Sequence, residues 1–423
     1  MRLLVLLCLV QCANSISAGE WPSWRGPNGN GIADGEQYPT QWSASENVKW
    51  KLPLPGSAGS TPVVTGSLIA LTCAERDAQD QNGKNKVWGL NREGELLWNT
   101  EVGNEKPGKH AKGSGCNPSP VTDGKSLFVY FKSGDFAALD LSGKIIWHKN
   151  LQTEYGADTL WWDLGTSAVL TEKHVVITVM QSGPSPSYIA AFDKETGEVV
   201  WKVLRELGAP EEAAQSYSTP VVTRFNEQET LMNVGADFVT AHSAVDGHEL
   251  WRVGSLNPEQ NKYFRSIASA AVADGMVVAP YSRGEMLYGI KLGGSGDVTK
   301  SHVVWSTKGI SSDVPTPIAV GGKAFVLTDK GVLACLNAKN GEVVWESQLE
   351  KNRHAFSASP ILAGGNLYAV REDGTTFVAE AGESFKQLSV NSLGEEVTVV
   401  ATPVFVDGQI LIRTFEGLYC IGK

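Results

Sequence analysis

Apolar and polar positions alternate in short runs along most of the chain, as in residues 323–328, Lys-Ala-Phe-Val-Leu-Thr. Alternation with a period of two predicts strands that bury one face. Turn-forming pairs such as Asp123-Gly124, Gly321-Gly322 and Asp407-Gly408 separate these runs. Such pairs supply the positive φ angles that tight hairpins need. The pattern therefore predicts a chain of short antiparallel strands.

A longer phrase recurs at intervals of about 40 to 50 residues, which is the period expected of a repeat architecture. Each copy has an apolar residue, Asp or Asn, a turn with glycine, two apolar residues and a tryptophan. In most copies the glycine stands four residues before the tryptophan. The tryptophans of this series are Trp50, Trp98, Trp147, Trp201, Trp251, Trp305 and Trp345.

A second phrase, a small or hydroxyl residue followed by Pro or Ala and then a β-branched residue, lies between these tryptophans. Its eight copies occupy residues 60–64, 119–121, 167–169, 218–222, 270–272, 316–318, 359–361 and 402–404. One unit therefore holds four antiparallel strands. Repeated four-stranded units predict an all-β fold, a β-propeller with eight blades.

The strand count predicts how the ring closes. After residue 402 only three strands remain, so blade 8 lacks an outer strand. Residues 46–52 supply one, and we expect them to pair with the stretch around Tyr419. The propeller then spans residues 46–423. Such a closure removes a free edge and joins the two ends of the chain.

The first residues form a separate unit. Residues 1–18 combine Arg2, a short apolar run and small polar residues, which is typical of a secretory signal peptide. The run is too short to span a bilayer, so no transmembrane segment is expected. Export to the periplasm or cell envelope, or secretion, follows. Lipidation at Cys12 is disfavoured because Gln11 stands where lipoprotein signals place a small residue.

The composition of the chain limits the classes of partner that the protein is expected to bind. The formal net charge is −10 and no run of Lys or Arg occurs. These features argue against nucleic acid and against a polybasic membrane patch. Helical periodicity is weak, and the best candidate, Glu206 to Gln215, is expected to contain at most a turn or two of helix.

The tryptophan phrase resembles the repeat of pyrroloquinoline-quinone-type propellers, and the resemblance covers residues 47–423. It implies that the tryptophans dock between neighbouring blades. Two copies depart from it: residues 293–300 are inserted before Trp305, and Lys386 replaces the tryptophan in blade 7.

The segment of residues 19–45, rich in Trp, Gly and Pro, is similar to the leader of BamB-like exported propellers of the planctomycete type. We expect this leader to cross one face or the rim of the ring, where Trp21, Trp24 and Trp42 pack. The alternative is an exposed aromatic docking arm.

Two kinds of function accompany this resemblance. The first is a non-enzymatic BamB-like scaffold that holds an envelope protein or an extended ligand at one face of the ring, with no cofactor. The alternative is a pyrroloquinoline quinone (PQQ)-dependent dehydrogenase of reduced size, in which calcium polarises the cofactor, or a carbohydrate-binding propeller. The chain has no Cys-Cys pair to cap a quinone and no Cys-x-x-Cys-His haem phrase, so we favour the scaffold.

The loops before the first strands of the blades should converge on the channel mouth. Arg265 and Arg353 are the preferred binding candidates, because arginines over a channel need an anion or a carboxylate partner. Each of the others also has a structural explanation, in turn hydrogen bonds, rim packing or solvation. They are Trp161, Trp162, Asp163, Tyr217, Asp313, His110 and His354.

No metal site can be assigned, because no carboxylate pair has a diagnostic spacing. Asn117 and Asp163 are the weak candidates for calcium ligands. Four cysteines follow the signal peptide, and their spacing fits no zinc pattern. In the propeller register Cys73 and Cys116 end on the same face, which makes a disulfide between them a hypothesis. Cys335 and Cys420 are expected to be buried.

Overall fold

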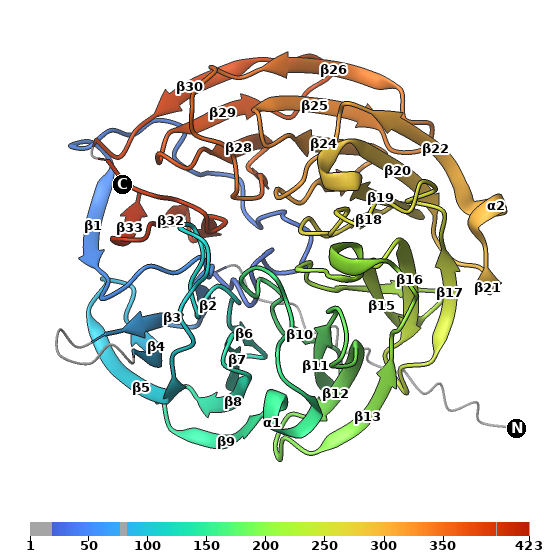
Figure 1. Ribbon diagram of the computed structural model, residues 1–423. Coiled ribbons are helices and arrows are strands. Elements are labelled where there is room, and N and C mark those ends of the chain that lie inside the picture. The colour runs from blue at the N-terminus through green and yellow to red at the C-terminus, as the bar shows by residue number, and fades with distance from the viewer. Residues whose placement is uncertain (1–18, 77–82, 395, 423) are drawn as a thin grey trace, which may run out of the picture.

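The computed structural model describes residues 19–76, 83–394 and 396–422, and these residues form eight antiparallel sheets around a central axis (Figure 1). The predicted all-β, eight-bladed propeller is therefore confirmed. The predicted signal peptide lies outside the described residues.

Each sheet is one blade. In blades 1 to 7 the strands follow in chain order from the axis to the rim, whereas the outermost strand of blade 8 comes from the N-terminal side of the chain. The blades are: first, β2 (Val63–Thr65), β3 (Leu68–Glu75), β4 (Lys84–Leu90) and β5 (Leu96–Asn104); second, β6 (Val121–Thr122), β7 (Ser126–Tyr130), β8 (Asp135–Asp140) and β9 (Ile145–Asn150); third, β10 (Val169–Leu170), β11 (His174–Val179), β12 (Tyr188–Asp193) and β13 (Val199–Leu204); fourth, β14 (Val221–Phe225), β15 (Gln228–Gly235), β16 (Phe238–Ser243) and β17 (Glu249–Val253).

The second half of the ring repeats this plan. Its blades are: fifth, β18 (Ala271–Ala273), β19 (Met276–Tyr281), β20 (Met286–Lys291) and β22 (Val303–Lys308); sixth, β23 (Ile318–Val320), β24 (Lys323–Leu327), β25 (Val332–Asn337) and β26 (Val343–Gln348); seventh, β27 (Ile361–Ala363), β28 (Asn366–Val370), β29 (Thr376–Glu380) and β30 (Gln387–Asn391); eighth, β31 (Val404–Val406), β32 (Gln409–Arg413), β33 (Gly417–Ile421) and β1 (Val48–Pro53).

The ring closes where β1 meets β33. Val48 pairs with Ile421, Lys51 with Tyr419 and Leu52 with Leu418, all antiparallel. The closure predicted from the strand count is therefore confirmed, and Figure 1 shows β1 at the rim beside β33. Blade 8 is thus built from both ends of the described chain, and its edge strand comes from the N-terminal side.

Tryptophans join neighbouring blades at the rim. The Trp147 indole Nε1 donates to the Lys194 carbonyl in the next blade, and Trp50 on β1 donates to Arg92 in blade 1, at 3.0 and 2.9 Å. A Cβ atom on Gly197, whose φ is +70°, would lie 2.6 Å from the Trp147 ring. Only glycine allows this approach and this backbone conformation. The recurring glycine therefore leaves room for the indole ring of the preceding blade's tryptophan to pack against the backbone.

Additional segments pack against the ring at both departures from the repeat. The inserted residues form β21 (Gly296–Asp297), which pairs parallel with β17 and covers the outer edge of blade 4. Blade 7 lacks the tryptophan, and there Trp42 of the leader is buried, with its backbone N–H donating to Asn391 on β30. Neither arrangement could be read from the repeat pattern.

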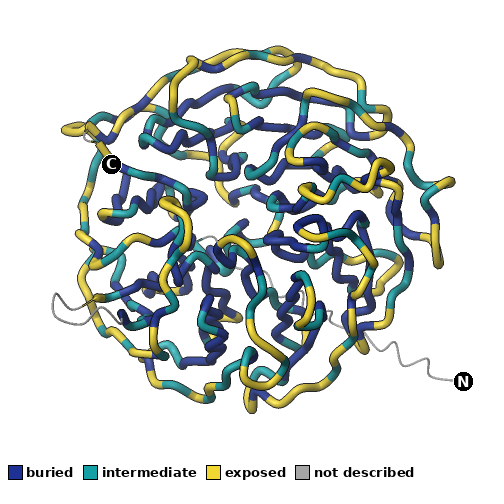
Figure 2. Tube along the Cα trace, in the orientation of Figure 1, coloured by how far each residue is buried: buried dark blue, intermediate teal, exposed yellow. Residues whose placement is uncertain are grey.

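Helix is scarce in the described chain. It comprises α1 (Leu151–Tyr155), α2 (Thr299–His302) and two 3-10 turns, η1 (Glu211–Ala214) and η2 (Ser282–Gly284). The expected short helix before Gln215 is reduced to η1. Figure 2 shows buried residues along the inner strands and exposed residues along the rim and loops. None of the helices within the described ranges is long and apolar enough to cross a membrane.

Candidate binding cup on the ring axis

A cavity of about 480 Å³ lies on the ring axis, on the face where the innermost strands begin. We call it the cup. Its wall includes one hydroxyl residue from every blade, directly before the innermost strand. These residues are Thr61, Ser119, Ser167, Thr219, Ser269, Thr316, Ser359 and Thr402.

These eight residues, which we call the hydroxyl belt, bind each blade to the next. The Thr61 backbone N–H donates to the Ser119 hydroxyl at 2.9 Å, and Ser119 donates in the same way to Ser167 at 2.9 Å. Five further bonds continue this order to Thr402, at 2.9 to 3.2 Å. The Thr61 hydroxyl closes the circle by donating to the Thr402 carbonyl at 3.1 Å. The belt is thus an inner seal of the ring.

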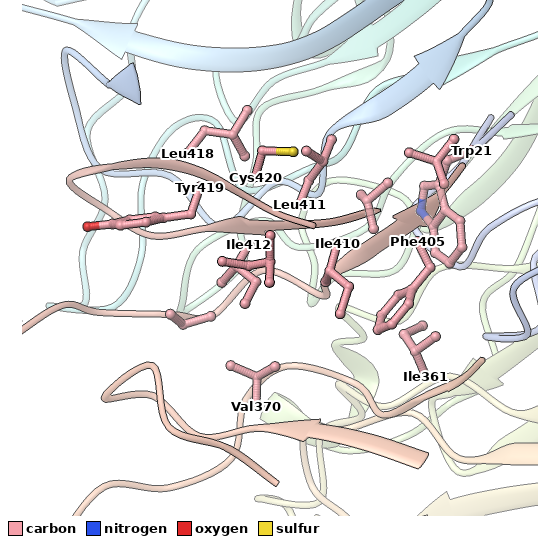
Figure 3. Packing of buried hydrophobic residues seen from close by; sticks show 14 of the residues in the cluster. Trp21, Ile361, Val370, Phe405, Ile410, Leu411, Ile412, Leu418, Tyr419 and Cys420 are labelled. Atoms are coloured by element: carbon pink, nitrogen blue, oxygen red, sulfur yellow. The ribbon is translucent and has the colours of Figure 1, made fainter. Parts of the chain in front are cut away.

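The leader closes the far end of the cup. Trp24 lines the cup and also a second cavity of about 1150 Å³ on the opposite face, so it lies between the two. Beside it, Trp21 is fully buried and pairs with Val64 through two backbone hydrogen bonds of 2.8 and 2.9 Å. Figure 3 shows Trp21 next to Phe405 of blade 8. The cup is therefore a dead end.

We call the part of the leader that closes the cup, around Trp21 and Trp24, the plug. Arg25 anchors the plug. Its guanidinium is buried and donates to the carbonyls of Pro317 at 2.6 Å, Pro360 at 3.0 Å and Asn30 at 3.2 Å. Burial lowers its pKa to about 9. No carboxylate pairs with it among the described residues. The charge is held by backbone dipoles of blades 6 and 7, so Arg25 ties the leader across the ring.

Asp163 organises one side of the mouth. Its carboxylate accepts the backbone N–H groups of Lys109 and His110, at 2.8 and 2.9 Å, and an ion pair from the buried Lys132. Both oxygens are thereby used. Asp163 shapes the loop that carries His110 and Lys112, and it presents no free acceptor to the cup.

Arg265 organises the other side. It forms a two-pronged pair with Asp313, at 2.7 and 2.9 Å, and its Nε lies 3.8 Å from Glu212. Glu212 also accepts the indole N–H of Trp162 at 2.8 Å. The Trp162 backbone N–H donates to the Tyr217 hydroxyl at 3.1 Å. The aromatic wall is therefore fixed by buried polar partners.

Of the predicted binding residues, five line the cup: His110, Trp162, Asp163, Tyr217 and Arg265. Four do not line it: Trp161, Asp313, Arg353 and His354. Asp313 instead orients Arg265. Arg353 is exposed and donates to the adjacent His354 at 3.1 Å, so the expected convergence of the two arginines is wrong.

Sequence reasoning missed three contributors to the cup. Arg283 and Lys112 line the cup, and Glu212 holds the aromatic wall from behind. Seven of the eight belt residues stand in the second repeated phrase as the Ser or Thr before Pro or Ala, and the eighth, Ser269, directly precedes the fifth copy. Arg283 had no such signal, because it depends on an unusual backbone turn.

The predicted disulfide is absent from the structure. Cys73 and Cys116 are both free and buried, as are Cys335 and Cys420. Burial raises the pKa of Cys73 to about 11 and that of Cys116 well above its usual range. The Cys116 thiol lies 3.5 Å from the Asn85 side-chain oxygen, with which it forms a weak hydrogen bond. Both are therefore thiols in the core of the ring.

The cup residues do not fit the calcium site of a quinone enzyme. The Asn117 side-chain oxygen already accepts from Gly59 N–H, Ser114 N–H and the Ser114 hydroxyl, at 2.9 to 3.2 Å. Asp163 is committed to amides and to Lys132. Calcium needs six to eight oxygen ligands. Within the described part of the chain no cluster of three or more His, Cys, Asp or Glu residues is placed to hold a metal.

Comparison with solved structures shows the same architecture elsewhere. BamB from Moraxella catarrhalis superposes with a TM-score of 0.61 at 15% identity, covering 88% of this chain and 96% of that one. A quinohemoprotein alcohol dehydrogenase from Comamonas testosteroni gives 0.65 at 13% identity, covering 97% and 82%. At such identities the likeness establishes the fold alone.

Sequence comparison is more specific. The outer membrane protein assembly factor BamB of Yersinia pestis is 21% identical over 340 residues, 76% of each chain. That of Alteromonas naphthalenivorans is 22% identical over 299 residues, 67% of this chain and 66% of the relative. The family model described as outer membrane protein assembly factor BamB matches residues 33–201, 115–228, 189–298 and 297–423. Together these matches cover most of the chain, which therefore belongs to the BamB family of β-propeller proteins.

Proposed function

We propose that this protein is an exported, non-enzymatic scaffold that binds a protein partner at the cup face of the ring, in the periplasm or on the cell envelope. The observation that carries the proposal is the construction of the mouth. A hydrogen bond to the buried Glu212 holds Trp162, and an ion pair with Asp313 holds Arg265, in fixed positions around an open cavity. Pre-organised aromatic and arginine side chains are the usual centres of protein interfaces.

The family supports this assignment. The BamB relatives are named outer membrane protein assembly factors, and such a role involves contact with other proteins. The dehydrogenase alternative has less support, because the oxygens of Asn117 and Asp163 are already committed within the protein. No observation at the cup favours a carbohydrate over a protein.

Two adjacent tryptophans give a matched test. Trp162 lines the cup and Trp161 does not, although each is 43% exposed. We expect Trp162→Ala to weaken capture of an envelope partner about tenfold or more, as truncation of a central aromatic commonly does. Trp161→Ala should leave capture near the wild-type level.

The measurement is quantitative co-purification after crosslinking in native envelopes, with melting temperature as the folding control. Equal capture by both variants would place the partner on another surface. Turnover of alcohols or sugars by protein supplied with calcium and pyrroloquinoline quinone would contradict the non-enzymatic assignment.

A further inference from the structure

The wall of the cup carries hydroxyl groups whose hydrogens have no acceptor among the described residues. Six belt hydroxyls accept a neighbouring amide and donate to no protein atom among the described residues. All six are at least nine-tenths buried and line the cup. They are Ser119, Ser167, Thr219, Thr316, Ser359 and Thr402. Buried hydroxyl hydrogens are ordinarily satisfied, so this wall is suited to an acceptor-rich ligand.

The mouth adds two further donors. His110 Nδ1 accepts the Lys112 backbone N–H at 3.1 Å, so its neutral ring carries the hydrogen on Nε2. The ring stands edge-on to Trp162, with centroids 5.9 Å apart. Arg283 lines the cup, and its one ion contact in the described structure is a loose 3.9 Å approach to Glu212. Its guanidinium is thus the least committed cation there.

Arg283 is held in a strained turn. Its φ and ψ are 55° and 43°, and it lies between Ser282 at φ 55° and Gly284 at φ 79°. Non-glycine residues rarely adopt this left-handed conformation, and it often marks a functional position. A Cβ on Gly284 would lie 2.8 Å from the Asp313 amide nitrogen. The tight turn therefore brings Arg283 against the loop of Asp313, at the edge of the cup.

The carboxylates stand behind these cations. Glu212, Asp313 and Glu372 pair with Arg265, Arg283 or Lys112 but do not line the cavity. Asp163 lines it with both oxygens occupied. The surface that a ligand meets consequently presents positive charge and N–H or O–H groups. Such a surface favours an anionic group rich in oxygen acceptors.

The plug determines how a chain can enter. Trp24 closes the far end, so a polypeptide cannot thread through the ring axis. A chain end can enter a dead-end cavity without turning back. We propose that the cup binds the C-terminal carboxylate of an extended polypeptide, with Arg283 pairing its charge and the hydroxyl belt and His110 donating to the terminal oxygens. This inference rests on the proposed protein-binding function, and it names the part of the partner that is held. Capture of chain termini by preorganised donors is an established recognition mode.

The test uses decapeptides immobilised through their N-termini, prepared in parallel with free C-terminal carboxylates and with C-terminal amides. Wild-type protein should bind a subset of the free-carboxylate peptides. It should bind the corresponding amides with an affinity lower by a factor of about ten or more, as expected for the loss of a charged hydrogen bond. Arg283→Gln should show a similar loss. Arg353→Gln, on an exposed arginine outside the cup, should bind as wild type.

Two additional arms separate the alternatives. Thr316→Val removes one belt hydroxyl. Once its folding is verified by melting temperature, this variant should show a larger loss of affinity for the carboxylate peptides than for the amides. Equal binding of amide and carboxylate forms would overturn the terminal-carboxylate inference while leaving the scaffold function standing. Binding of succinate but of no peptide, abolished by Arg283→Gln, would contradict the polypeptide source. Absence of binding by every probe, together with intact partner capture, would also overturn the inference.

Discussion

A chain that begins at Leu54 is expected to form no stable monomer, whereas a chain that begins at Glu46 is expected to fold. The two differ only in the closing strand. Without β1, blade 8 loses its outermost strand, the ladder to β33 and the contact of Trp50 with blade 1. The exposed edge of β33 would then be free to pair with another chain. Size-exclusion chromatography and near-UV circular dichroism measure the outcome.

The full-length variant Trp50→Ala provides a second measure that keeps the leader intact. Trp50 is half-buried, so we expect its loss to lower the free energy of unfolding by about 2 to 3 kcal/mol, below the range for a fully buried tryptophan. A peptide of residues 46–53 added to the Leu54 chain should restore the monomer. A monomeric Leu54 chain with the wild-type near-UV spectrum would show that closure by β1 is dispensable.

Arg25→Ala is expected to lower the free energy of unfolding by about 2 to 4 kcal/mol, because it leaves the buried carbonyls of Pro317 and Pro360 and the half-buried carbonyl of Asn30 without this donor. The loss is limited by the desolvation that Arg25 itself suffers, which its lowered pKa reflects. The plug should loosen with it, since Trp24 is the neighbouring residue. Urea denaturation followed by tryptophan fluorescence gives the free energy.

Arg224→Ala is the matched control. Arg224 is 57% exposed and pairs on the surface with Glu172 at 3.1 Å. Exposed pairs of this kind contribute about 1 kcal/mol or less. If the two arginine variants unfold at the same urea concentration, Arg25 is not the anchor that its contacts indicate.

The sequence predicted the ring because the repeat leaves a physical signature. Five of the seven tryptophans pack against a glycine in the next blade, as Trp147 packs against Gly197, so packing between blades constrains residues at fixed spacing. The strand count also predicted closure by β1, because blade 8 was one strand short. Period-two alternation and turn residues were sufficient for these features.

The site was only partly predictable because its geometry does not repeat. Arg265 and Arg353 lie in loops before the innermost strands, yet Arg265 lines the cup in an ion pair with Asp313, whereas Arg353 is exposed and does not line the cup. Arg283 depends on a left-handed turn, and the plug depends on Arg25 finding carbonyls nearly 300 or more residues away in sequence. Contacts of this kind are set by tertiary packing and carry no local pattern.

Site-specific photo-crosslinking tests the central claim most directly, that the partner binds at the cup face. A photoreactive residue at Lys112, which lines the cup, is compared with one at Val200, an exposed position on the outer strand β13. We predict a covalent adduct to a discrete envelope protein from position 112 and none from position 200. An adduct from position 200 alone would contradict the claim and assign binding to the rim.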